Sequence, residues 1–138
     1  MTVAPKNTSF DFVLGPLESE VMEAVWNLGG WVPVTEVLEE RERRGGTQLA
    51  YSTIKAVLTN LHDKGHLEKR AEGKQNAFKP KLGRDEFAAR AVGRVVDPLL
   101  RDHRNPLLAH IVDELIDDES ALAEFEALLA AKKKRRAE

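Results

Sequence analysis

The 138-residue chain contains no cysteine, which excludes disulfide bonds and every zinc or copper site that needs a thiolate ligand. Histidine is the other common ligand for such metals, and the chain has four histidines. They form no close pair within one helix, because Gly65 separates His62 from His66. We therefore expect neither a metal site nor a cofactor.

The chain also lacks long apolar runs, and its first residues show no secretory pattern. No stretch approaches the roughly 20 consecutive apolar residues that a membrane-spanning helix requires. Residues 1–14 carry a single lysine and no apolar segment of useful length. We therefore expect a cytoplasmic protein that makes no contact with a membrane.

Motifs typical of enzymes are absent as well. The sequence contains no nucleophile elbow, no phosphate-binding loop and no cluster of metal ligands. Two acidic clusters, at residues 39–40 and 117–119, are explained as solvated helix ends. We therefore expect a protein that is not an enzyme.

Positive charge is concentrated in one part of an otherwise slightly acidic chain. The whole chain has a formal net charge of −2 and a pI near 6.1, which argues against indiscriminate coating of nucleic acid. Residues 47–81 nevertheless carry seven lysines and arginines against three acidic residues, a net charge of +4. Such local concentration is typical of a surface that binds DNA.

The central part of this basic segment, residues 50–67, has the pattern of an amphipathic helix. Ile54, Val57, Leu58 and Leu61 recur at helical spacing, and Gly65 marks the end of the helix. The other sides are mostly short, uncharged or basic, which suits insertion into the DNA major groove. The alternative is an ordinary solvated face. The candidate DNA-reading residues are Ser52, Thr53, Lys55, Ala56, Thr59 and Asn60.

The surrounding segments predict a winged helix-turn-helix domain over residues 14–82. Helices are expected at residues 17–28 and 34–44, and strands at 66–70 and 76–81, with Gly73 in the turn between the strands. A short strand at residues 31–32 should pair with this hairpin. Thr35, at the start of the second helix, is placed to meet a phosphate. Residues 1–13 are expected to form a flexible tail, and the domain should fold without the residues that follow it.

Residues 83–138 predict a helical module with apolar stripes. Helices are expected at residues 84–104, 106–116 and 118–131, with a kink or break at Pro98. Because a monomer would expose these stripes, we interpret the module as a dimerisation domain; the alternative is that it packs back on the winged helix. The basic run at residues 132–136 is interpreted as a solvated helix end, with a DNA-binding tail as the alternative. The candidate dimer contacts are Val95, Leu99, Leu107, Leu108, Ile111, Val112, Leu115, Leu122, Phe125 and Leu128.

Three segments together, residues 14–29, 32–40 and 50–80, resemble the BlaI/MecI/CopY family of bacterial transcriptional repressors. The leucines, Lys64 and Gly65 of residues 58–67, followed by a wing that ends at residues 78–80, carry most of the resemblance. The resemblance implies a homodimer that represses β-lactamase-type genes by binding a pseudo-palindromic operator. It places Ser52, Thr53, Lys55 and Ala56 in the major groove, and it places Gly73, Lys74 and Phe78 along the DNA backbone.

The chain departs from the family pattern at several positions. Ala56, Asn60 and Phe78 stand where family members often have threonine, arginine and tyrosine. The copper-responsive branch uses C-terminal cysteines, which this chain lacks. The β-lactam branch, with a sensor-protease as partner, is inactivated by cleavage at an Asn–Phe bond. This chain has no Asn–Phe dipeptide, and a loose alignment places residues 94–95 at that position.

The other function open to this fold is a winged-helix module for protein–protein interaction. Such modules present an apolar or acidic recognition face. The serine, threonine and lysine side chains of residues 52–60 favour DNA instead.

Overall fold

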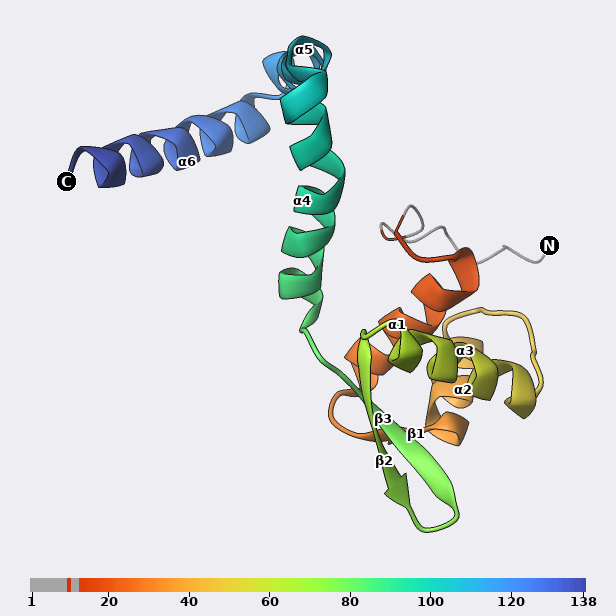
Figure 1. Ribbon diagram of the computed structural model, residues 1–138. Helices are drawn as coiled ribbons and strands as arrows, with labels where there is room; N and C mark the ends of the chain where they lie inside the picture. Colours follow the sequence, from red (N-terminus) through yellow and green to blue (C-terminus); the bar gives the residue numbers. More distant parts are fainter. Residues whose placement is uncertain (1–9, 11–12) are drawn as a thin grey trace. The chain divides into compact units, whose positions relative to one another are not determined.

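The computed structural model of the chain describes residue 10 and residues 13–138, which form two compact units, Met1–Val92 and Gly93–Glu138. Each unit is described by itself. The described residues contain six helices and three strands, as the sequence predicts for a mainly helical protein with a small β-wing (Figure 1). In chain order the elements are α1 (Pro16–Leu28), β1 (Val32–Pro33), α2 (Val34–Arg43), α3 (Tyr51–Asp63), β2 (Leu67–Glu72), β3 (Gln75–Pro80), α4 (Arg84–Asp102), α5 (Arg104–Ile116) and α6 (Glu119–Ala137).

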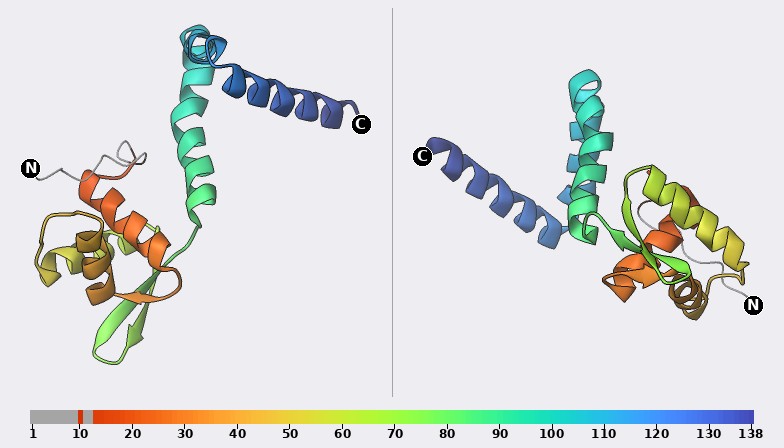
Figure 2. Two further views of the ribbon diagram at one scale, coloured as in Figure 1. Left: turned by 180° about the vertical axis from the view of Figure 1, so that it is seen from behind. Right: turned by 60° about the horizontal axis from the view of Figure 1, so that its bottom comes forward.

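The three strands form one antiparallel sheet with the order β1-β3-β2. Val32 of β1 and Lys69 of β2 both pair with Phe78 on the central strand. The predicted pairing of a short strand near residue 32 with the hairpin is therefore confirmed. The β2–β3 hairpin projects beyond helices α1–α3, as Figure 1 and the left view of Figure 2 show.

The core of the first unit lies between α1, α2, α3 and the sheet. Ile54, Leu58 and Leu61 of α3 are fully buried, as the helical spacing predicts. They belong to one apolar cluster with Val21 of α1 and Leu67 of β2. Burying one stripe of α3 leaves its opposite side to solvent, and this fixes which residues of α3 can contact a partner.

The first unit extends into α4, ten residues beyond the boundary that the sequence predicts. Phe87 and Ala91 are 6% and 5% exposed and belong to the winged-helix core. Phe10 is also buried, so it is part of this core and not of a flexible tail; residues 1–9 and 11–12 lie outside the described residues. The rings of Phe10, Trp26 and Phe87 meet edge to face, with centroid distances of 5.0–5.5 Å. This contact fixes the first turns of α4 against α1.

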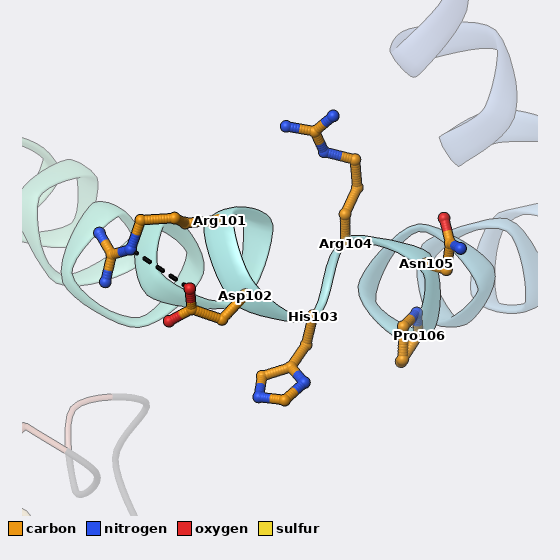
Figure 3. Close-up of a pocket in the computed structure, with 6 residues that line it drawn as sticks. All are labelled: Arg101, Asp102, His103, Arg104, Asn105 and Pro106. Atoms are coloured by element: carbon orange, nitrogen blue, oxygen red, sulfur yellow. Dashed lines mark ion pairs between the residues drawn. The ribbon is translucent and has the colours of Figure 1, made fainter.

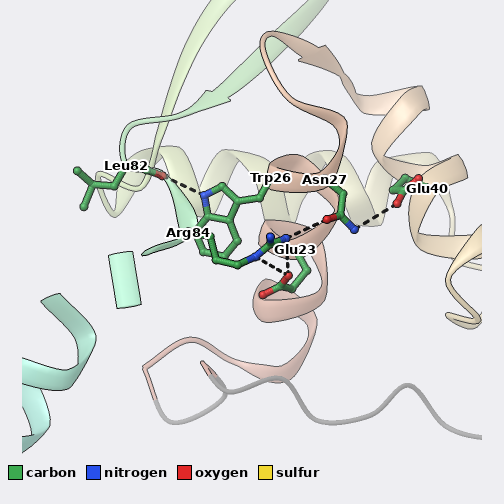
Figure 4. Close-up of polar contacts among 6 residues, drawn as sticks. All are labelled: Glu23, Trp26, Asn27, Glu40, Leu82 and Arg84. Atoms are coloured by element: carbon green, nitrogen blue, oxygen red, sulfur yellow. Dashed lines mark hydrogen bonds and ion pairs between the residues drawn. The ribbon is translucent and has the colours of Figure 1, made fainter. Parts of the chain in front are cut away.

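Polar contacts reinforce the attachment of α4 to α1 (Figure 4). The indole Nε1 of Trp26 donates a hydrogen bond to the carbonyl oxygen of Leu82 at 2.9 Å. The guanidinium of Arg84 pairs with Glu23 at 2.9 Å and donates to the side-chain oxygen of Asn27, also at 2.9 Å. The start of α4 is therefore a structural part of the winged helix.

The second unit leaves its apolar side chains largely uncovered. No side chain of α5 or α6 is buried, and the most apolar positions fall into two groups. The half-buried group comprises Leu107, Ile111, Leu115 and Leu122. The exposed group comprises Leu108, Val112, Ile116, Phe125, Leu128 and Leu129, together with Val95 and Leu99 of α4.

Two helices in the second half of the chain run further without interruption than the sequence predicts. Pro98 lies inside α4, which runs unbroken from Arg84 to Asp102 although proline cannot donate a backbone hydrogen bond. Helix α6 continues to Ala137, so the basic run at residues 132–136 is helical. In the part of the chain that the structure describes, no helix combines the length and the apolar character needed to cross a membrane.

Glu18 at the start of α1 provides a pH-dependent contact. Partial burial alone would raise its pKa, but Lys64 at 2.9 Å and the Gly15 backbone N–H at 3.1 Å favour the carboxylate. The net effect lowers the pKa of Glu18 below its ordinary value of 4.5. A carboxyl group with a lowered pKa stabilises the fold above its ordinary pKa, and this contribution is lost as the pH falls through the pKa of the folded state.

We therefore expect Glu18→Gln to lower the free energy of unfolding at pH 7 by about 0.5–1 kcal/mol, since Lys64 is half exposed to solvent. The difference should shrink below pH 4.5. Urea titrations of the variant and the original chain at pH 7 and in acid measure it. Glu39→Gln, at an exposed position of α2, is the control and should change stability little at either pH. An equal loss for Glu18→Gln at both pH values would contradict the assignment.

Candidate nucleic-acid interface

Helix α3 presents the predicted polar face to solvent. Ser52, Lys55, Ala56 and Asn60 are exposed, and Thr53 and Thr59 are half-buried at its margins. The hydroxyl of Thr59 donates to the carbonyl oxygen of Lys55 at 2.9 Å, so its proton is used within the helix. The face therefore offers short polar groups and one flexible cation, a combination that suits the edges of DNA bases.

The start of α3 contributes one exposed residue that is not among the predicted DNA-reading residues. Tyr51 is 40% exposed and occupies the first position of the helix. No side chain caps the helix at Ala50, so the backbone N–H groups of its first turn are not used by a cap. A helix N-terminus of this kind attracts anions. The signal in the sequence was its place directly before Ser52, which puts it in the same helical turn as two candidate reading residues.

The wing presents lysines at its tip and along its strands. Gly73 has a φ of +64° in the turn between β2 and β3, and Lys74 follows it at the exposed tip.

Thr35 is exposed in the first turn of α2, where no side chain caps the helix. Gly73, Lys74 and Thr35 are therefore all accessible to a ligand.

Phe78 does not have the role that the resemblance implies. Its side chain is 1% exposed, because Phe78 lies on the central strand, next to Val32 of β1, and packs in the apolar core. A buried ring cannot lie along the DNA backbone, so the prediction for Phe78 is wrong. The absence of a hydroxyl at this position then affects packing and not a phosphate contact.

Internal ion pairs use part of the positive charge of residues 47–81. Lys64 pairs with Glu18 at 2.9 Å, and Arg70 pairs with Glu72 at 2.6 Å. The remaining lysines of this segment are exposed and have no ion pair within the described residues; they are Lys55, Lys69, Lys74, Lys79 and Lys81. They form the cationic surface available to an anionic ligand.

Trp31 anchors two cations at the base of the wing. The guanidinium of Arg70 lies 4.4 Å from the centroid of its ring, and the ammonium of Lys79 lies 5.9 Å from it. Cation–π contacts of this kind restrain long side chains. Because Arg70 also pairs with Glu72, we assign this contact to wing stability; the sequence gives no indication of it.

A shallow hollow in the second unit, at the turn between α4 and α5, offers no comparable site. Arg101 pairs with Asp102 at 3.5 Å, while His103 and Arg104 point to opposite sides of the chain (Figure 3). Across residue 10 and residues 13–138, no group of three or more acidic or histidine side chains is arranged to hold a metal ion.

Helices α1–α3 followed by a β-hairpin, with α3 exposing a polar face, define the winged helix-turn-helix class. The Penicillinase repressor family matches residues 14–131, and the chain belongs to this family. The proteins named "Transcriptional regulator BlaI" from two Mycobacterium tuberculosis strains, CDC 1551 and H37Rv, are each 33% identical over 123 residues. The match covers 83% of this chain and 86% of each relative.

A similar arrangement occurs in a solved structure of low sequence identity. The complex structure of hsRosR-S1 matches with a TM-score of 0.50 and 16% identity, over 92% of this chain and 98% of that chain. This likeness concerns the fold alone.

Proposed function

We propose that the protein is a transcriptional repressor that binds a pseudo-palindromic operator as a homodimer, with α3 in the major groove and the wing along the DNA backbone. The family and the name of the mycobacterial relatives support regulation of transcription. The exposed face of α3 carries the proposal, because it combines Ser52, Lys55 and Asn60 on a helix whose opposite side is buried in the core. Nothing acidic lies within that face to repel phosphate.

The uncovered apolar side chains of the second unit support the homodimer. Leu128 is 62% exposed, Val112 is 57% exposed and Phe125 is 44% exposed. Large contiguous apolar surfaces are unusual on monomers and typical of interfaces. A second copy of the chain would cover them and would present two α3 helices to two half-sites.

Two lysines should have separable roles in DNA binding. Lys55→Ala on α3 should weaken operator binding roughly tenfold, with a smaller effect on random DNA, because its ammonium group reaches base edges. Lys74→Ala at the wing tip should weaken binding to both DNAs about equally, because a phosphate contact carries no sequence information. Fluorescence anisotropy with an operator duplex, obtained by selection from a random library, and with a scrambled duplex measures both effects.

Salt dependence and a control complete this test. Lys74→Ala should also reduce the slope of log affinity against log salt by about 1. Arg90→Ala, at an exposed position of α4, removes one positive charge outside the proposed interface and should change neither the discrimination between the two DNAs nor the salt slope. Equal loss of discrimination in Lys55→Ala and Lys74→Ala would show that the roles are assigned wrongly.

A further inference from the structure

The connection between α2 and α3, residues 44–50, leads directly into the proposed DNA-reading turn. Leu49 is partly buried against the core and gives this connection an apolar anchor. Within the described residues, the side chain of Arg41 is the one that donates hydrogen bonds to this connection from the rest of the winged helix. Arg41 therefore links the body of the winged helix to the segment that orients α3.

Arg41 is a buried arginine with partners on two sides. Its side chain is 5% exposed, and its Nε donates to the Glu20 carboxylate of α1 at 2.8 Å. Its terminal nitrogens point to the connection, where they donate to the carbonyl oxygen of Thr47 and, at 3.4 Å, to the hydroxyl oxygen of Thr47. The guanidinium thus bridges α1 and the connection.

Gly46 allows the connection to close around this side chain. A Cβ atom at Gly46 would lie 2.9 Å from the carbonyl oxygen of Arg41 and 3.0 Å from both its Cγ and its Cζ. The backbone N–H of Gly46 donates to that same carbonyl oxygen at 3.0 Å. The absence of a side chain at residue 46 is therefore a steric requirement of the arginine contact.

The energetics favour one position of the connection. A charge that is almost completely buried is costly unless it is paired and its N–H groups are hydrogen-bonded. Glu20 satisfies the Nε side, but the terminal nitrogens would lose their partners if Thr47 moved away. Because that loss is expensive, Arg41 holds Thr47 in place, and Thr47 lies only a few residues before Ser52.

We propose that Arg41 is a positioning residue for DNA reading: it fixes residues 44–50 and thereby the first turn of α3. The proposal rests on the proposed function. It requires that loosening the contact reduces the discrimination between operator and random DNA. Non-specific binding should persist, because Arg41 is buried and touches no phosphate.

Two full-length variants disturb the contact from opposite sides without changing the net charge. Arg41→Lys keeps the charge beside Glu20 but lacks the planar fork that reaches two partners at once. Gly46→Ala places a methyl group against Arg41, and residue 46 has no left-handed backbone conformation that would forbid alanine. Arg43→Lys is the matched control, since Arg43 is 64% exposed on the same helix and pairs with Glu40 at its surface.

Binding to a selected operator duplex and to a scrambled duplex of the same length gives the discrimination ratio. We expect both variants to lower this ratio about tenfold, the scale of one lost base contact, with the same salt slope on scrambled DNA. Arg43→Lys should leave the ratio unchanged. A ratio unchanged in Arg41→Lys and Gly46→Ala would overturn the proposal.

Hydrogen exchange of the free protein provides a test without DNA. Backbone amides of residues 47–53 should exchange faster in Arg41→Lys and Gly46→Ala than in Arg43→Lys, while the amides of α1 keep their protection. Uniformly faster exchange, including α1, would mean general destabilisation and would overturn a positioning role. If the original chain itself shows no discrimination between the duplexes, the proposed function fails, whereas local exchange still reports on the arginine contact.

Discussion

A fragment that ends at Val92 should fold as a monomer and bind a two-half-site operator about a hundredfold or more weakly than the full chain. The fragment keeps the complete first unit, including Phe87 and Ala91. It lacks α5, α6 and every exposed apolar side chain of the second unit, so it has no means of linking two recognition helices. Analytical ultracentrifugation and an anisotropy titration with the operator duplex measure the two effects.

A shorter fragment serves as the control for this experiment. Ending the chain at Lys81 removes Phe87, Ala91 and the Leu82 carbonyl oxygen that accepts the Trp26 hydrogen bond. This fragment should be clearly less stable than the fragment that ends at Val92, so its loss of binding would not report on dimerisation. If the longer fragment is still a dimer, or binds the operator as tightly as the full chain, the second unit is not the dimer interface.

The second large effect is expected at Phe87, the residue that joins α4 to the winged helix. Phe87→Ala should destabilise the first unit by about 3–5 kcal/mol, because it removes a buried ring and leaves a cavity. Its ring lies 5.3 Å from Trp26 and 5.0 Å from Phe10, centroid to centroid. Unfolding in urea, followed by tryptophan fluorescence, measures the loss.

Val92→Ala is the matched control for Phe87→Ala. Val92 lies in the same helix but is 57% exposed, so its truncation should cost less than about 0.5 kcal/mol. Similar stabilities for Phe87→Ala and Val92→Ala would mean that α4 contributes no packing to the first unit.

Much of the fold follows from periodicity in the sequence. Ile54, Leu58 and Leu61 are spaced for one helix face, and all three are fully buried. Periodicity shows which side of an element is apolar but not which element covers it. Periodicity therefore assigns the apolar stripe that begins at Phe87 to the helical module, although its first residues pack in the winged-helix core.

The inward side of the hairpin and the contacts of the connection before α3 are harder to predict. Apart from Ala71, strand β2 is polar at every position after Leu67, so its sequence does not show that the neighbouring Phe78 faces inward. Arg41 lies in a run of charged residues, and only its helical spacing from Val34 and Val37 marks the inward side. Its partners, Glu20 and Thr47, are distant or unremarkable in sequence and become visible only in three dimensions.

Selection of binding sites from a random duplex library shows whether the protein reads an inverted repeat as a dimer. The full chain is incubated with the library at moderate salt, and bound duplexes are recovered and sequenced through several rounds. We expect an enriched inverted repeat whose half-site centres are about 10 base pairs, or a multiple of that, apart. Enrichment of no sequence, or of a single site without a repeat, would contradict a dimeric repressor that reads DNA through α3.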